Sequence, residues 1–169
     1  MTVAFRTPGT GDAEKLAALG VKSFSETFGH LYRPEDLALF LENHTAEKWR
    51  AALADRALAI RLGEADGQAV AYAKLTPPDL PAEIREPAIE LKQFYVLNGW
   101  QGAGVAAPLM DWVIEEAGNR GAQGLYLSVF TENERAQRFY ARFGFTEVGR
   151  QKFMVGSHAD EDIVMRRGL

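Results

Sequence analysis

The stretch Trp100-Gln101-Gly102-Ala103-Gly104-Val105-Ala106-Ala107 lies between an apolar run at residues 89–97 and a segment with helical periodicity. Its glycines and alanines are small enough to let the backbone come close to a bulky group. A strand, a glycine-rich turn and a helix start together form an anion site, because unpaired backbone N–H groups point outward and the helix dipole favours negative charge. The stretch therefore predicts a cradle for a pyrophosphate.

Two common phosphate-binding patterns fit this stretch poorly. The dinucleotide fingerprint G-x-G-x-x-G would need a glycine where Ala107 stands, and the unit lies mid-chain instead of at the first strand-to-helix turn. The nucleoside-triphosphate loop requires Gly-Lys-Ser/Thr, and residues 100–107 contain no lysine. A different phosphate carrier is therefore expected.

The composition indicates one domain spanning residues 1–169. Hydrophobic residues make up 47% and charged residues 25%, and 19 Lys+Arg against 23 Asp+Glu give a net charge of −4. Without a Lys/Arg cluster, nucleic-acid binding is disfavoured. The absence of cysteine excludes thiolate chemistry and disulfides, and the 3 histidines lack metal-ligand spacing, so no metal is expected. No signal peptide or membrane-spanning apolar run is evident, and a cytoplasmic protein without a membrane partner is the simplest expectation.

The first third of the chain is expected to be mainly helical. Asp12 is expected to cap the first helix and Gly29 to end it. Pro34 lies at the expected start of a second helix, and residues 45–53 form a third.

The rest of the chain predicts strands with two helices between them. Strands are expected at residues 57–63, 69–75, 89–97, 125–130, 145–148, 153–155 and 163–165. The first two form a hairpin around Asp66-Gly67. Pro108 is tolerated only in a first helical turn, so one helix begins close to Gly104, and Gly144 ends the other. This order predicts a single α+β domain with α/β-like features.

A second motif at residues 133–145 reads Asn-Glu-Arg-Ala-Gln-Arg-Phe-Tyr-Ala-Arg-Phe-Gly-Phe. Gln101-x-x-Gly104-x-Ala106 followed by Asn-x-x-Ala-x-x-Phe-Tyr-x-x-x-Gly-Phe resembles the GCN5-related N-acetyltransferase (GNAT) superfamily. The matching segments cover about a third of the chain. More loosely, residues 26–28 and 153–156 look like bacterial spermidine/spermine N-acetyltransferases of the PaiA type.

The resemblance implies the GNAT fold, a mixed and mostly antiparallel twisted sheet of about six or seven strands flanked by helices, with a splayed strand pair at the cofactor site. It also implies acetyl-CoA as the acyl donor. In that arrangement the strand backbone at residues 94–96 pairs with the pantetheine arm, and the amides of residues 102–107 hold the pyrophosphate. The implied cofactor-binding residues are Phe94, Tyr95, Val96, Gln101, Gly102, Ala103, Gly104, Val105, Ala106, Ala107, Asn133, Ala136, Tyr140 and Arg142.

Tyr140 matches the general acid of the superfamily, which protonates the departing CoA thiolate. A phenol with an unperturbed pKa of about 10 is protonated at neutral pH and can supply that proton. Its alternative role is a core tyrosine, because Phe139, Tyr140 and Phe143 recur at helical spacing. Asn133 has a similar alternative as a helix cap, either by itself or within a capping box that starts at Thr131.

An acceptor amine must lose a proton before it attacks, because an alkyl ammonium has a pKa of about 10.4. Some members of the superfamily use a glutamate on the strand before the cradle, where this chain has Glu90. Others place a glutamate on the following strand, where this chain has Ser128. Glu90 is therefore the candidate base, directly or through a water, and its alternative role is a strand-end carboxylate paired with Lys92.

The resemblance implies direct attack by a primary amine in a ternary complex, with a polyamine or another small amine favoured. Glu26 and Tyr32 are candidate residues of the acceptor pocket, and the acidic run at residues 160–162 is expected to be a solvated loop that could face a cation. The alternatives are a protein N-terminal or amino-acid acetyltransferase, and a non-catalytic acyl-CoA-binding sensor. The sequence leaves the acceptor open, and its late strands are compatible with a homodimer.

Overall fold

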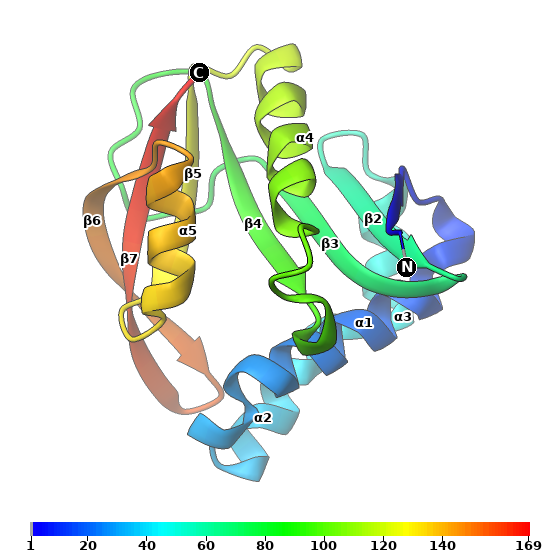
Figure 1. Cartoon of the computed structure of the whole chain (residues 1–169). Helices are drawn as coiled ribbons and strands as arrows, with labels where there is room; N and C mark the ends of the chain where they lie inside the picture. The colour runs from blue at the N-terminus through cyan, green and yellow to red at the C-terminus, as the bar shows by residue number, and fades with distance from the viewer. Residues whose placement is uncertain (1) are drawn as a thin grey trace.

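The computed structural model describes residues 2–169 as a seven-stranded sheet with helices on both faces (Figure 1). The strands lie in the order β1-β2-β3-β4-β5-β7-β6, and of these neighbouring pairs only β4–β5 is parallel. The strands are β1 Ala4–Arg6, β2 Ala59–Ala65, β3 Gln68–Thr76, β4 Ala88–Val96, β5 Gly124–Phe130, β6 Thr146–Val155 and β7 His158–Gly168. The α-helices are α1 Ala13–Phe28, α2 Pro34–Leu41, α3 Ala46–Ala54, α4 Ala106–Asn119 and α5 Glu134–Arg142. None of the helices in this part of the chain has the length and apolar character needed to cross a membrane.

Each face of the sheet carries its own apolar core. Helices α4 and α5 cover one face, where Leu109 of α4 and Leu125 of β5 are fully buried in the same cluster. Helices α1 and α3 cover the other face, where Leu16, Trp49 and Tyr72 are buried together. Apolar side chains are buried away from water on both faces of the sheet, and this burial stabilises the central strands β3 and β4.

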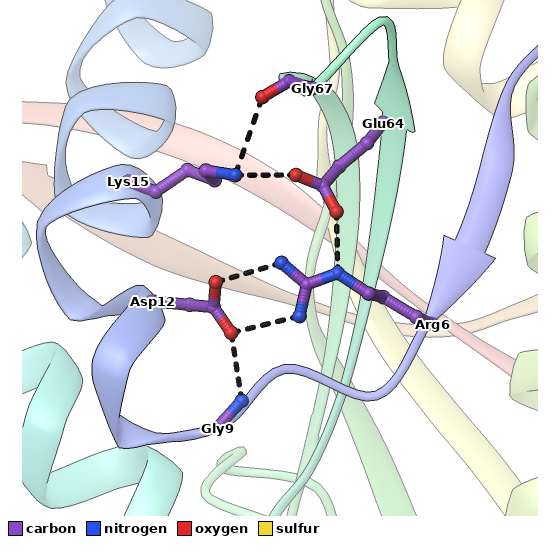
Figure 2. Close-up of polar contacts among 6 residues, drawn as sticks. All are labelled: Arg6, Gly9, Asp12, Lys15, Glu64 and Gly67. Atoms are coloured by element: carbon purple, nitrogen blue, oxygen red, sulfur yellow. Dashed lines mark hydrogen bonds and ion pairs between the residues drawn. The ribbon is translucent and has the colours of Figure 1, made fainter.

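The first strand is tied to the fold by a polar network (Figure 2). Arg6 of β1 donates to the two carboxylate oxygens of Asp12 at 2.8 and 2.9 Å and also binds Glu64 of β2, which Lys15 of α1 reaches from its other side. The guanidinium lowers the pKa of Asp12 to about 2. Asp12 precedes α1 as expected, but its side chain makes no capping hydrogen bond to the helix. The predicted cap is therefore wrong, because the carboxylate takes a charge-assisted bidentate partner and the Gly9 N–H instead.

Several predicted boundaries are confirmed. Pro34 begins α2, and the hydroxyl of Thr45 caps α3 by accepting from the Lys48 N–H at 3.2 Å. The hairpin between β2 and β3 turns at Asp66 and Gly67, both with positive φ. Gly144, with φ of +86°, stands just after α5 and ends it as expected.

Two predicted boundaries differ from the structure. Gly29 does not end the first helix in a left-handed conformation, because its φ is −56° and the chain continues into the short 3₁₀ helix η2 at Gly29–Leu31. The sequence predicted three late strands, but the structure has two. Strand β6 joins the segments expected at residues 145–148 and 153–155, and β7 contains the one expected at residues 163–165. Cross-strand pairing with β7 along its whole length holds the intervening polar residues in strand conformation.

The feature that positions the site is the divergence of β4 and β5. These strands pair only at Ala88 with Gly124, Ile89 with Leu125, and Glu90 with Tyr126. Beyond that point they move apart, as Figure 1 shows for the lower half of the sheet. Residues 91–96 of β4 and 127–130 of β5 do not pair with each other, and we call these two segments the splayed edges.

Candidate active site

The splayed edge of β4 has backbone groups free on one side. Residues 94–96 pair with β3 through Ala73, Tyr72 and Ala71, and they have no strand partner toward β5. Backbone N–H and C=O groups need hydrogen-bond partners, so this edge suits an extended polar chain lying between the two strands. Phe94, Tyr95 and Val96 lie on this edge, and their pairing with a pantetheine arm stays a prediction.

The glycine-rich stretch forms the turn between β4 and α4, after the short 3₁₀ helix η4 at Asn98–Trp100. Gly102 and Gly104 both have φ of +76°, a conformation that strains other residues, and the space above their Cα atoms is open. Helix α4 begins at Ala106, and its N-cap residue Val105 offers no side-chain acceptor to the first N–H groups. An open turn before an uncapped helix start can accept an anionic group, so the residues fit a pyrophosphate.

Gln101 braces this region in a way that sequence reasoning missed. Its side-chain amide donates to the carbonyl oxygen of Val96 at 3.1 Å and accepts from the Arg135 guanidinium of α5 at 2.8 Å. One side chain therefore links the end of β4 to the first turn of α5, across the space between the splayed edges.

Helix α5 positions the other predicted donor-site residues. The Asn133 side chain accepts from the Ala136 N–H at 3.3 Å, so Asn133 caps the helix, whereas Thr131 lies outside it. The exposed side chain of Arg142 lies at the far end of the same helix. Asn133 thus fills the capping role considered for it, and Ala136 lies within its first turn.

Tyr140 faces inward from α5 and is 9% exposed. Its ring packs edge-on against Phe94 of β4 and Phe145, with centroids 6.3 and 5.8 Å away. Burial raises the pKa of the Tyr140 phenol above its usual value, and the nearby Tyr95 adds to the rise. The phenol is therefore neutral and carries its proton throughout the physiological pH range, which is the state a general acid needs.

Glu90 lies at the closed end of the divergence, in the last residue pair that joins β4 to β5. It is 2% exposed, accepts from the Asp79 N–H at 2.8 Å, and has the Lys92 ammonium 3.6 Å from its other oxygen. The pairing with Lys92 that the sequence suggested as an alternative is therefore present.

The acidic run at residues 160–162 is not the solvated loop expected from the sequence. It belongs to β7, where the alternation of a strand turns Asp160 and Asp162 inward and leaves Glu161 exposed. Residues 158–162 do not alternate between apolar and polar types, so no local sequence signal marks this arrangement. The inward Asp160 carboxylate accepts from the Tyr32 hydroxyl and lies 3.0 Å from a ring nitrogen of His158.

The two residues predicted for an acceptor pocket lie in different surroundings. Tyr32 lies just after η2, and its hydroxyl donates to the Asp160 carboxylate of β7. Burial is the main cause that raises the pKa of the Tyr32 phenol, and this hydrogen bond adds to the rise. Glu26 of α1 accepts from the Asn98 N–H at 3.1 Å and so holds the start of the turn before α4. Tyr32 therefore lies beside the inward carboxylates of β7, whereas Glu26 is bound to the chain segment that follows β4.

The diverging parallel pair and the open glycine turn are the arrangement that the resemblance to acetyltransferases implied. A family model described as "Acetyltransferase (GNAT) family" matches residues 21–145, and the chain belongs to that family. An uncharacterized N-acetyltransferase of Mycobacterium tuberculosis is 36% identical over 159 residues, which cover 94% of this chain and 98% of the relative. Another from Lactobacillus delbrueckii subsp. lactis is 28% identical over 160 residues, covering 94% and 92%.

Solved structures share the fold. A PaiA N-acetyltransferase from Thermoplasma acidophilum, solved in complex with coenzyme A, superposes with a TM-score of 0.79 at 17% identity and full coverage of both chains, 100% and 100%. A GCN5-related N-acetyltransferase from Rhodopseudomonas palustris gives 0.78 at 23% identity, covering 100% of this chain and 97% of that one. The predicted superfamily and fold class are thereby confirmed.

Proposed function

We propose that this N-acetyltransferase moves an acetyl group from acetyl-CoA to a primary amine, with a polyamine or another small amine favoured, by direct attack in a ternary complex. The observation that carries the proposal is the placement of Tyr140, whose buried phenol lies against the splayed edge of β4 while the open glycine turn lies at the end of the same strand. A long donor with a phosphate at one end and a thioester at the other fits this arrangement.

The donor seat is built mainly from backbone. The N–H groups of residues 102–107 hold the pyrophosphate, and the free edge of residues 94–96 pairs with the pantetheine arm. The Thermoplasma PaiA protein, which has the same fold, was solved in complex with coenzyme A, and this supports coenzyme A as the carrier of the acetyl group. Asn133 and Ala136 at the start of α5, and Arg142 at its end, complete the proposed set of donor-binding residues.

Each proton in the reaction has a proposed place. The amine nitrogen forms a bond to the thioester carbonyl carbon, whose oxygen is polarised by a strand N–H such as that of Val96. The C–S bond breaks, Tyr140 gives its proton to the departing sulfur, and the new amide nitrogen returns one. The proton that the ammonium loses before attack goes to Glu90, directly or through a water, and then to solvent. The sum is one ammonium and one thioester giving one amide, one thiol and one proton.

Glu90→Gln tests the proposed base. If the carboxylate takes the proton of the ammonium, we expect kcat/KM to fall by about 10²-fold or more and the pH–rate profile to depart from that of the parent. Glu83→Gln, a change of an exposed glutamate in the loop before β4, is the matched control. A pH–rate profile of Glu90→Gln that overlays the parent profile would leave Glu90 with a structural role only.

The acceptor class is tested by thiol release from acetyl-CoA across polyamines, simple alkylamines, amino acids and peptides with free N-termini. We expect the small amines to be the best acceptors. A preference for peptides or amino acids would select the alternative acetyltransferases, and tight donor binding without turnover on any amine would select the sensor. A homodimer is also proposed, because the edge strand β6 exposes Val148 and Met154 at 49% and 51%. The single domain at residues 1–169 and the cytoplasmic location stay predictions of the sequence.

A further inference from the structure

Among residues 2–169, three carboxylates are buried: Asp36, Glu90 and Asp162, with 3%, 2% and 5% exposure. Asp36 accepts from the N–H and the hydroxyl of Ser157, both at 2.8 Å. Glu90 has a loop N–H at 2.8 Å and an ammonium at 3.6 Å. Asp162 differs from both, since among the described residues the Ser128 hydroxyl is the donor that approaches its carboxylate and no cationic side chain pairs with it.

A buried carboxylate without a cationic partner is costly, and the surroundings of Asp162 show that cost. The pKa of Asp162 is raised to about 6: burial is the main cause, a hydrogen bond from the Ser128 hydroxyl opposes it, and the neighbouring Asp160 adds to the rise. Asp162 is therefore ionised at pH 7 and above. A cation would supply the partner that the protein does not.

The carboxylate lies beside the proposed reaction site. Asp162 stands opposite Phe130 in the β5–β7 register, at the splayed end of β5. Its charge raises the pKa of the Tyr95 phenol on β4, which is already raised by burial, and Tyr95 in turn raises that of Tyr140. Asp162 of β7 and Tyr95 of β4 therefore lie near each other, and Asp162 is at the end of β5 that diverges from β4.

The oxygens of Asp162 are not sealed from solvent. Within the described part of the chain, the side-chain nitrogen or oxygen atom that is fully enclosed without a partner is Arg61 Nε. The oxygens of Asp162 are not of this kind, and the residue keeps 5% of its surface exposed. A ligand group can reach them.

We propose that Asp162 anchors a second ammonium group of the acceptor, so that the enzyme favours diamines and longer polyamines over monoamines. This inference rests on the proposed amine acetylation and adds the residue that selects the acceptor. The reacting amine must be neutral to attack, whereas an anchoring ammonium must stay charged, so the two nitrogens need different surroundings. The buried carboxylate of Asp162 suits the charged one. Asp160 adds negative charge nearby but is already held by Tyr32 and His158.

The test compares a diamine with a monoamine of the same chain length, such as 1,4-diaminobutane and butylamine. We expect kcat/KM of the parent to favour the diamine by about 10- to 100-fold, the usual scale of a charge-assisted contact. In Asp162→Asn the ratio should fall to near one, mainly through a higher KM for the diamine. Glu161→Gln, the neighbouring outward-facing acid, is the matched control and should keep the parent ratio.

The pH dependence gives a second readout. The titratable groups near Asp162 are Tyr95 from β4, Tyr32 from the segment after η2 and Asp160 from its own strand, and both phenols stay neutral because their pKa values are raised. The diamine preference of the parent should therefore fade as the pH drops through about 6, where Asp162 gains a proton.

The outcomes separate this inference from the function on which it rests. If the parent acetylates no amine, the proposed function fails. If the parent acetylates amines and Asp162→Asn keeps the parent's diamine preference, while binding acetyl-CoA as the parent does, the anchor is overturned and the function stands. A parent without any diamine preference would also overturn the anchor.

Discussion

Tyr140→Phe is expected to lower kcat by about 10²- to 10⁴-fold, the usual contribution of a positioned general acid. The phenol is 9% exposed and packed against the splayed edge of β4, so the ring position should survive the loss of one oxygen. Acetyl-CoA affinity should change little, because the proposed donor contacts are mainly backbone. Steady-state turnover and the Kd for the donor, measured together, check both parts.

The control for this change is Tyr126→Phe, which removes a hydroxyl that donates to Glu86 at 2.8 Å, outside the splayed edges. We expect it to keep near-parental turnover. An acyl donor whose thiol is more acidic needs less help on leaving, so the deficit of Tyr140→Phe should shrink with such a donor. Parental kcat in Tyr140→Phe would show that this tyrosine is only part of the core.

The double variant Gly102→Ala, Gly104→Ala is expected to weaken acetyl-CoA binding by about 10- to 100-fold. Each glycine has φ of +76°, a conformation that costs an L-residue about 1 to 2 kcal/mol. The turn should therefore relax to another conformation, in which its N–H groups no longer point at the pyrophosphate. The added methyl groups meet no atoms within 4 Å, so a direct clash is not the reason. Donor affinity by calorimetry checks this.

Gly99→Ala is the matched control. Gly99 also has open space at its Cβ position, but it lies in η4 without a positive φ. The Gly99→Ala variant should therefore bind acetyl-CoA nearly as the parent does. Equal losses in the control and the double variant, or parental affinity in both, would contradict the role of the left-handed turn.

The sequence predicted the fold well where local chemistry decides it. The Asp66-Gly67 turn allows few alternatives to a tight hairpin, and Pro108 confines a helix start to the residues just before it. The glycines of residues 102–104 marked the turn between β4 and α4 for the same reason. In each case one residue type restricts the backbone, whatever the rest of the chain does.

The sequence failed where a side chain takes a partner that no local pattern announces. Asp12 was expected to cap a helix, but Arg6 takes its carboxylate, and Glu64 enters the same network from 58 residues after Arg6. Asp162 looked like part of a solvated loop because its two neighbours are also acidic. Its burial depends on pairing with β5, more than 30 residues earlier, and no local pattern announces that pairing.

The central claim is that this chain joins an acetyl group from acetyl-CoA to an amine between the splayed edges of β4 and β5. The most direct measurement mixes the enzyme with acetyl-CoA and 1,4-diaminobutane and follows free thiol and N-acetylated amine together, by thiol titration and mass spectrometry. We predict equal amounts of both products, formed only when the amine is present, with no acetyl group left on the protein. Thiol release without acetylated amine, or bound donor that never turns over, would contradict the account.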